Sequence, residues 1–158
     1  MDQSLFDQLR FVRGQTLKLM AGVTEEQADV IPDGFRNSIR WNLGHIYVVL
    51  ERFAFHYVGL PLHLPKGIKE RFETGSSPLT ADVSTPAPTL PELERLLIEQ
   101  LDRVQESLGT RLNVDVVPPY TTSAGMKLAT IGEFLSFNLY HEGMHIGTIK
   151  SYKKLTGS

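Results

Sequence analysis

Apolar residues recur every three to four positions in four long segments, the spacing that places them on one face of an α-helix. The segments cover roughly residues 4–20, 38–58, 89–109 and 130–155. They are too long for ordinary β-strands, which have about 3 to 10 residues. The pattern therefore predicts four amphipathic helices, with stripes that include Leu5, Leu9 and Val12; Ile39, Leu43 and Ile46; Leu93, Leu97 and Leu101; and Leu135, Leu139 and Ile146.

Residues that cap helices mark where three of these segments begin. Ser38 is a favourable cap for the second helix. Thr89 and Thr130 each begin a capping box, in which a threonine and a glutamate three residues later bind each other's backbone. Thr24 begins a further capping box, which predicts a short helix after it. A second short helix is expected over residues 66–73.

A connection from Gly59 to Leu90 joins the second and third long helices and contains five prolines. A connection of this length in a compact domain usually covers a site or crosses the end of a bundle. A short extended stretch is expected at residues 112–117. Because no shift in composition marks a boundary, we predict one domain over residues 1–158. The expected fold is all-α, a four-helix bundle with a long crossover loop between helices 2 and 3.

Composition limits the classes of function. The chain has 158 residues, 41% of them hydrophobic and 22% charged, which suits one globular domain. A formal net charge of −2 gives no electrostatic basis for nucleic-acid binding. The absence of cysteine excludes disulfides and a cysteine nucleophile. No signal-peptide pattern or membrane-length apolar run is visible, so we expect a cytoplasmic protein with no nucleic-acid or membrane partner.

Histidines supply the candidate chemistry. His141 and His145 are four residues apart in the last predicted helix, so they lie one above the other on the same face. His45 lies in the second predicted helix. We hypothesise that the three imidazoles meet inside the bundle and bind one metal ion. Three neutral imidazoles suit zinc, nickel, iron or copper, and leave coordination positions open for water or substrate.

Glu142 raises a competing hypothesis. Together with the two histidines that flank it, His141 and His145, it matches the H-E-x-x-H pattern of zinc peptidases, in which the glutamate is the general base. The third ligand of such enzymes usually follows the pair, and no histidine or acid follows His145. A solvated carboxylate, or one that supports the metal ligands, is the alternative interpretation of Glu142. A non-catalytic, dimeric helical bundle is a further alternative.

Other polar residues near the histidines are candidates for a substrate pocket. Asn42, Asn138 and Tyr152 share helical faces with the histidines, so each is either a pocket group or a hydrogen-bonded core residue. His56 lies about 16 Å further along the helix axis than His45, too far to join the same ion. His63 is expected to be a solvated loop residue.

Two motifs resemble those of a known family. The stretch from Ser38 to His45, SIRWNLGH, looks like the second-helix signature of DinB-like (YfiT-like) proteins. The stretch from His141 to Gly147, HEGMHIG, is similar to the C-terminal motif of the same family. The resemblance covers essentially the whole chain. The family often has glutamine where this chain has Thr148.

The resemblance implies a four-helix bundle in which His45, His141 and His145 bind zinc or nickel. The wider superfamily includes bacillithiol- and mycothiol-dependent transferases and isomerases. By this likeness we expect a metal-dependent S-transferase or a hydrolase-like enzyme. It would activate bacillithiol or a similar thiol, or water, to attack a small electrophilic substrate. The resemblance also implies that the protein can form a homodimer.

Overall fold

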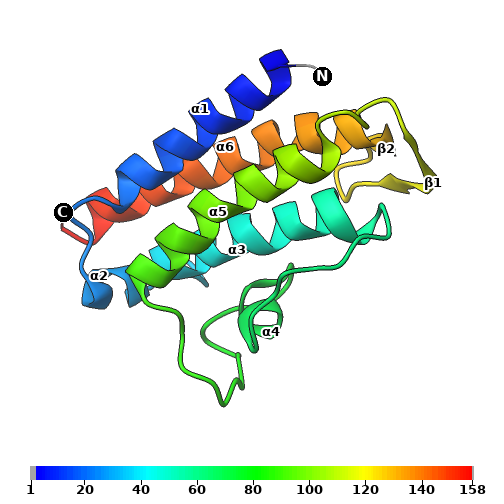
Figure 1. The fold of residues 1–158 in the computed structure, drawn as a ribbon. Helices are drawn as coiled ribbons and strands as arrows, with labels where there is room; N and C mark the ends of the chain where they lie inside the picture. The colour runs from blue at the N-terminus through cyan, green and yellow to red at the C-terminus, as the bar shows by residue number, and fades with distance from the viewer. Residues whose placement is uncertain (1–2, 158) are drawn as a thin grey trace.

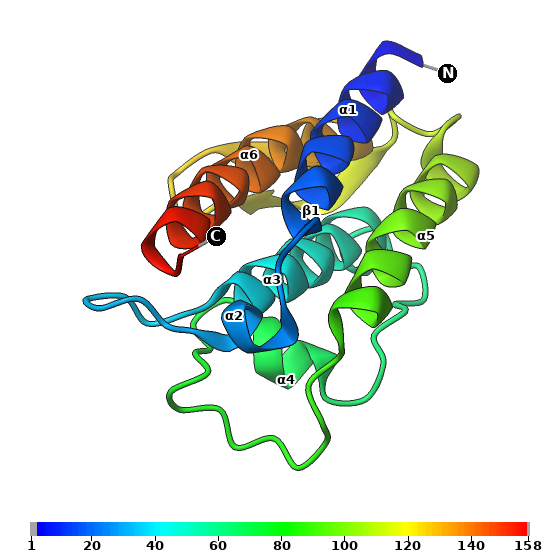
Figure 2. The ribbon, with the colours of Figure 1, turned by 90° about the vertical axis from the view of Figure 1, so that its left-hand side faces the viewer.

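The computed structural model describes residues 3–157 and is mostly helical (Figure 1). Residues 1–2 and 158, which the predicted domain includes, lie outside the described residues. Four long helices run side by side in both Figure 1 and Figure 2. Helices α1 and α3 each pack against both α5 and α6. The bounds of the four are α1 Gln3–Met20, α3 Ile39–Glu51, α5 Leu90–Leu108 and α6 Ile131–Leu155.

The helix ends follow the capping signals in the sequence. The Ser38 hydroxyl accepts a hydrogen bond from the backbone N–H of Trp41 at 3.2 Å. Thr89 and Thr130 both form complete capping boxes, as predicted. The second helical segment was expected to continue to about residue 58. Instead, α3 ends at Glu51, and one π-helical turn, η1 Arg52–His56, continues the helical backbone.

Short elements complete the fold. Helices α2 Glu25–Asp29 and α4 Ile68–Phe72 lie where the sequence predicted short helices. Strands β1 Asp115–Thr121 and β2 Lys127–Thr130 form an antiparallel pair, so the expectation of an all-α fold was wrong in this region. An extended stretch was expected only at residues 112–117. The second strand has four residues and depends on pairing with β1, so its own sequence carries no period-2 signal of useful length.

The apolar stripes predicted from the sequence form the core. One cluster of buried side chains includes Ile39, Leu43 and Leu93, and a second includes Phe6 and Phe134. Buried polar residues from α1, α3, α5 and α6 accompany these clusters. Within residues 3–157, no helix combines the length and the apolar character that crossing a bilayer requires.

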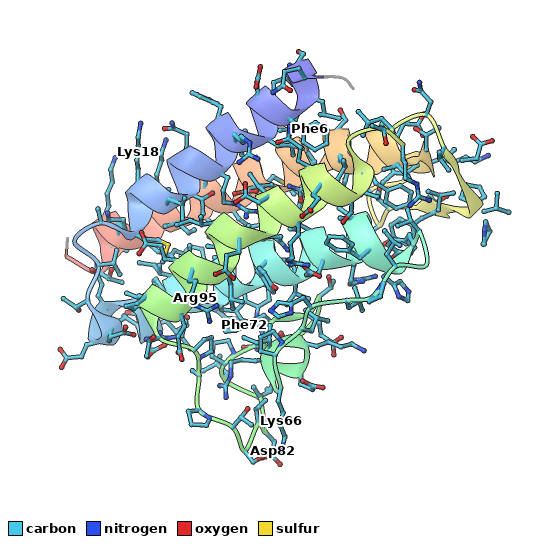
Figure 3. The ribbon with its side chains drawn as sticks, viewed as in Figure 1. Phe6, Lys18, Lys66, Phe72, Asp82 and Arg95 are labelled. Carbon is cyan, nitrogen blue, oxygen red and sulfur yellow. The ribbon has the colours of Figure 1, made fainter. Side chains whose placement is uncertain are left out.

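The long connection before α5 lies against the first half of α3. Gly44 makes this approach possible, because a Cβ at that position would lie only 2.4 Å from the ring of Phe72. Phe72 is the last residue of α4, and Figure 3 shows it where α4 meets the long helices. The far end of the connection is held by Arg40, whose guanidinium binds Asp29, Glu25 and the carbonyl of Pro88. The connection therefore covers the part of α3 that carries His45.

Candidate metal centre

Three histidines from two helices converge between α3 and α6. One ring nitrogen from each of His45, His141 and His145 can be chosen so that all three lie within 4.8 Å of one another. The ring centroids are 4.6 to 5.1 Å apart. Among residues 3–157, this is the one group of three or more histidines or acids with metal-ligand spacing. His56 and His63 are not part of it, as the sequence predicted.

His45 is oriented by the backbone of α4. Its Nδ1 lies 2.7 Å from the carbonyl oxygen of Phe72. A carbonyl oxygen only accepts hydrogen bonds, so Nδ1 of His45 carries the proton and Nε2 of the neutral ring has a free lone pair. The indole of Trp41 stacks on the imidazole, with 4.5 Å between ring centroids and 13° between planes. The close approach at Gly44 thus places Phe72 where it fixes the tautomer of His45.

His145 is oriented by Asn42 in the same way. Its Nδ1 lies 2.7 Å from Oδ1 of Asn42. The amide nitrogen of Asn42 donates to Oδ1 of Asn37 and to the carbonyl of Ser38, which fixes which end of the amide faces His145. Nδ1 of His145 therefore donates, and Nε2 presents its lone pair to the other two rings. Ligating histidines in metalloproteins are commonly held by such hydrogen bonds.

His141 completes the group. Its Nε2 lies 3.3 Å from Nε2 of His45. Two nitrogens that each bind a tetrahedral zinc ion at about 2.0–2.1 Å are separated by about 3.3 Å. Because Nε2 of His45 is unprotonated, either a proton on His141 or a cation must lie between the two nitrogens. The observed separation therefore fits a shared metal ion.

Burial keeps the three imidazoles neutral. It lowers the pKa of His141 to about 3, with His145 and His45 adding to the effect. It lowers the pKa of His145 to about 4, again with a contribution from His45. Burial also lowers the pKa of His45, against the opposing effect of the Phe72 carbonyl. All three rings are therefore neutral at neutral pH, which is the charge state in which an imidazole binds a metal ion.

Glu142 is not placed to act as a general base beside the histidines. Its carboxylate accepts hydrogen bonds from Arg13 at 2.8 and 3.1 Å and from Thr16 at 2.7 Å. The side chains of Arg13 and Glu142 are both only 2% exposed. A carboxylate bound in this way lacks a free face for a water molecule or a substrate proton. The peptidase hypothesis is therefore not supported, and Glu142 is not solvated either.

The three residues expected near a substrate pocket are buried. Asn42, Asn138 and Tyr152 are 1%, 0% and 2% exposed. Asn138 donates to Glu142 at 3.5 Å, and its Oδ1 has no hydrogen-bond partner among residues 3–157. Asn42 orients a histidine, and Asn138 and Tyr152 make hydrogen bonds within the core. A role for these three residues in a substrate pocket stays a prediction.

Two supporting residues were missed at the level of sequence. Asn37 accepts from Asn42 and from the hydroxyl of Tyr152, the latter at 2.8 Å, so it links Tyr152 to the group that holds His145. Phe72 contributes through its backbone carbonyl, which any residue type could supply. Asn37 could have been noticed because it precedes the cap residue Ser38. The contribution of Phe72 had no signal in the sequence.

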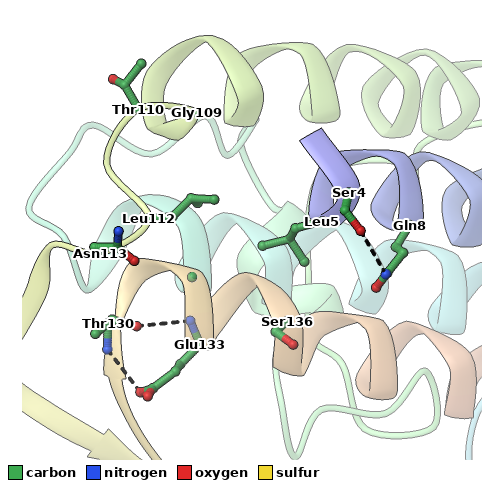
Figure 4. Close-up of a pocket in the computed structure, with 11 residues that line it drawn as sticks. Ser4, Leu5, Gln8, Gly109, Thr110, Leu112, Asn113, Thr130, Glu133 and Ser136 are labelled. Carbon is green, nitrogen blue, oxygen red and sulfur yellow. Dashed lines mark hydrogen bonds between the residues drawn. The ribbon is translucent and has the colours of Figure 1, made fainter. Parts of the chain in front are cut away.

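A separate cavity of about 560 Å³ lies between the beginnings of α1 and α6 and the end of α5 (Figure 4). Its lining is largely polar and contains none of the three histidines. Glu133, on its wall, is occupied with the capping box of Thr130. The candidate site is therefore the histidine cluster and not this cavity.

Both the fold and the sequence of this chain resemble those of known proteins. A crystal structure of a conserved protein from Enterococcus faecalis resembles the fold with a TM-score of 0.70 and 15% sequence identity. The similarity covers 99% of this chain and 96% of the other. No curated protein matches the chain. The family model of the DinB superfamily matches residues 8–149 of this chain. That match covers most of the sequence, and the protein therefore belongs to the DinB superfamily.

Proposed function

We propose that this protein is a metal-dependent enzyme that activates a low-molecular-weight thiol, or water, for reaction with a small electrophilic molecule. Zinc or nickel would be held by His45, His141 and His145 in a four-helix bundle. The thiol would be bacillithiol or a similar compound, and the reaction an S-transfer or a hydrolysis. The single observation that carries the proposal is the convergence of three neutral imidazoles, two of them with their Nε2 atoms 3.3 Å apart.

The donor set favours a catalytic site over a structural one. Structural zinc sites are usually closed by four protein ligands, most often cysteines. Here no fourth histidine, cysteine or acid joins the group among residues 3–157. A divalent metal bound by three histidines acts as a Lewis acid and favours the ionised form of a bound thiol or water. An open position is therefore available for the nucleophile.

The chain's own residues would position the ligands and restrict access. Phe72 and Asn42 fix the tautomers of His45 and His145, so both rings direct Nε2 inward. Trp41 covers one side of His45, and its indole N–H donates to Ser76 at 2.9 Å. Such pre-set orientation lowers the reorganisation needed for metal binding. A cytoplasmic location and a homodimeric state belong to the same proposal.

Metal analysis of untagged protein tests the ligand assignment. His141→Ala and His145→Ala should each abolish stoichiometric zinc or nickel, because two imidazoles bind far more weakly than three. His56→Ala is the matched control, since it removes a histidine outside the group, and it should retain wild-type metal content. Equal loss in all three variants would show that the assignment is wrong.

The reaction class is tested on the metal-loaded protein. Incubation with bacillithiol, glutathione or coenzyme A and a generic electrophile should give a thioether product with at least one thiol. A hydrolase would instead consume the electrophile at the same rate with and without thiol. Wild-type metal content with neither reaction would leave a metal-binding bundle and overturn the catalytic part of the proposal.

A further inference from the structure

The exposed face of α6 lacks charge over most of its length. Figure 2 shows α6 at the edge of the bundle, and between Glu133 and Lys150 none of its exposed residues is charged. We define the outer face of α6 by its exposed, uncharged residues, which are Ser136, Tyr140, Gly143, Met144, Gly147 and Ser151. The exposed residues of α5 include six charged ones, which are Glu92, Glu94, Arg95, Glu99, Asp102 and Glu106. Two long helices of the same bundle therefore present very different surfaces to their surroundings.

Large apolar side chains lie on this outer face. Tyr140 and Met144, one helical turn apart, are 56% and 46% exposed. Met126, which precedes β2, is 53% exposed. Together with Ala124 and Phe137, Met126 and Tyr140 line a mostly apolar groove of about 460 Å³. Exposed apolar side chains gathered around a groove are typical of a surface that contacts another protein.

The two glycines of the outer face have no packing reason within the chain. Gly143 and Gly147 lie inside α6, where glycine is less favourable than alanine. A Cβ at either position would meet no atom of the described residues within 4 Å. Gly44 differs, because a Cβ there would collide with a neighbouring ring. Exposed helical glycines leave room for a second backbone to approach closely.

The charges at the ends of α6 indicate which surface this is. Glu133 lies in the first turn, whereas Lys150 and Lys154 lie near the end of the helix. Two copies of α6 in parallel would place like charges side by side. In an antiparallel pair, each acidic end lies beside a basic end, and the two helix dipoles also oppose each other. The outer face of α6 is therefore complementary to itself when one copy is reversed.

We infer that the outer face of α6 binds the same face of a second copy of this chain, antiparallel, about a two-fold axis midway between Gly143 and Met144. This axis places Tyr140 of each copy against Gly147 of the other, and Met144 against Gly143, so a large side chain meets a glycine at every central position. The next pairs outward are Ser136 with Ser151 and Glu133 with Lys154. Such an interface closes as a dimer. The inference rests on the homodimeric state included in the proposed function and gives it a surface and a symmetry.

Sedimentation of untagged protein over a range of concentrations measures the dimer. Gly147→Gln inserts a side chain where the copies touch and should weaken dimerisation by about tenfold or more, the effect of overpacking a close contact. Gly14→Gln is the matched control, because a Cβ at Gly14 of α1 also meets nothing within 4 Å. Gly14 lies one turn from the exposed Arg10 and Lys18, outside the inferred interface, so the control should dimerise as wild type. Neither variant should melt at a lower temperature as a monomer, since glutamine favours a helix more than glycine does.

Cross-linking tests the orientation, and the absence of native cysteine makes introduced thiols specific. Ser136→Cys and Ser151→Cys should each fail to link to their own copies, because about 22 Å of helix separates equivalent positions in the antiparallel pair. A mixture of the two variants should form a disulfide-linked dimer on oxidation, since these positions face each other. Ser107→Cys, on the exposed surface of α5, is the control and should not link to either variant.

The outcomes separate this inference from the rest of the proposed function. A chain that stays monomeric at all concentrations refutes both the interface and the homodimeric state, while the metal content of the same sample tests the histidine site independently. A dimer that Gly147→Gln leaves intact shows that another surface is used. Linking of Ser136→Cys to itself, with no product from the mixture, refutes the antiparallel arrangement.

Discussion

His141 and Glu142 are neighbours in the sequence of α6, yet they belong to two opposite kinds of buried polar site. On one face, three neutral imidazoles converge, with two Nε2 atoms 3.3 Å apart. On the other, the carboxylate of Glu142 is paired with Arg13 and accepts a hydrogen bond from the hydroxyl of Thr16. The same guanidinium also donates to Gln100. The first group needs a proton or a cation between its members, whereas the second is neutralised within the chain.

The difference separates buried polar groups that stabilise the fold from buried polar groups that can bind a ligand. Buried polar groups in folded proteins are normally satisfied, and an unsatisfied group is a sign of a ligand or a special role. The ion pair of Arg13 and Glu142 links α1 to α6, and the guanidinium also donates to Leu97 on α5. It holds three helices together and leaves nothing for a ligand. His45 and His145 each make one hydrogen bond to the protein through Nδ1. Their Nε2 atoms are left to bind a ligand.

The largest effect that distinguishes the two faces is expected from Glu142→Gln. Breaking a buried ion pair leaves an uncompensated charge, here on Arg13, and should lower the free energy of unfolding by about 3–5 kcal/mol. Metal content of the folded fraction should stay at the wild-type level, because Glu142 does not face the histidines. Urea unfolding of the metal-free protein and metal analysis measure the two quantities separately.

Glu99→Gln is the matched control for that variant. Glu99 pairs with Arg95 on the exposed surface of α5, so the same chemical change should alter the free energy of unfolding by less than about 1 kcal/mol. Loss of metal without loss of stability in Glu142→Gln would reverse the assignment of the two faces and revive the idea of a catalytic glutamate.

The same contrast shows what sequence can and cannot predict. The spacing of His141 and His145 placed both rings on one face of a helix, and the caps at Ser38 and Thr130 located the helices that carry the site. Those are local properties. The partner of Glu142 was not predictable, because Arg13 lies 129 positions earlier, and only tertiary packing brings the two together.

The sequence could not decide between a pocket role and a core role for Asn138 and Tyr152, for a related reason. Helical periodicity puts a residue on a face, but whether that face opens to a pocket or to another helix depends on what packs there. Asn138 and Tyr152 share faces with the histidines and are nevertheless enclosed. The strand β2 was missed because four residues acquire their conformation from pairing with β1.

The second effect in size is the pH dependence of the metal-free protein. The folded-state pKa values of His141 and His145, about 3 and about 4, lie below the ordinary value of 6.5. The unfolded chain therefore takes up protons below pH 6.5 that the folded chain refuses, and stability falls as the pH drops towards about 4. We expect a loss on the order of 1–3 kcal/mol between pH 6.5 and about pH 5.

Denaturant unfolding at several pH values measures this slope, with His141→Gln as the comparison. Removing one buried imidazole should reduce the slope. Saturating zinc should steepen the dependence, because protons then compete with a ligand of the native state. A flat profile in the metal-free protein would mean that the histidines are solvated and not enclosed.

Asn42→Ala should have a smaller effect, which is measured as metal affinity. Loss of the group that orients His145 should weaken zinc or nickel binding by about 10- to 100-fold, the usual cost of removing a hydrogen bond to a ligating histidine. Asn138→Ala is the matched control: it is also a buried asparagine, but it donates to Glu142. It should lower stability and leave affinity nearly unchanged, as measured by competition with a chelator. Equal weakening in both variants would erase the distinction between the two faces.

Tyr152→Phe is expected to have the smallest effect and tests how far support for the metal centre extends. The hydroxyl donates to Asn37 at 2.8 Å, and Asn37 also accepts from Asn42, so two hydrogen bonds separate Tyr152 from the residue that holds His145. Removing the hydroxyl should cost about 1 kcal/mol in unfolding free energy. Metal affinity should change by less than about threefold, because Asn37 keeps its bond to Asn42 and Asn42 keeps its second acceptor, the carbonyl of Ser38. An affinity loss as large as that of Asn42→Ala would show that the whole chain of hydrogen bonds acts as one unit, and that the metal centre begins at the buried tyrosine.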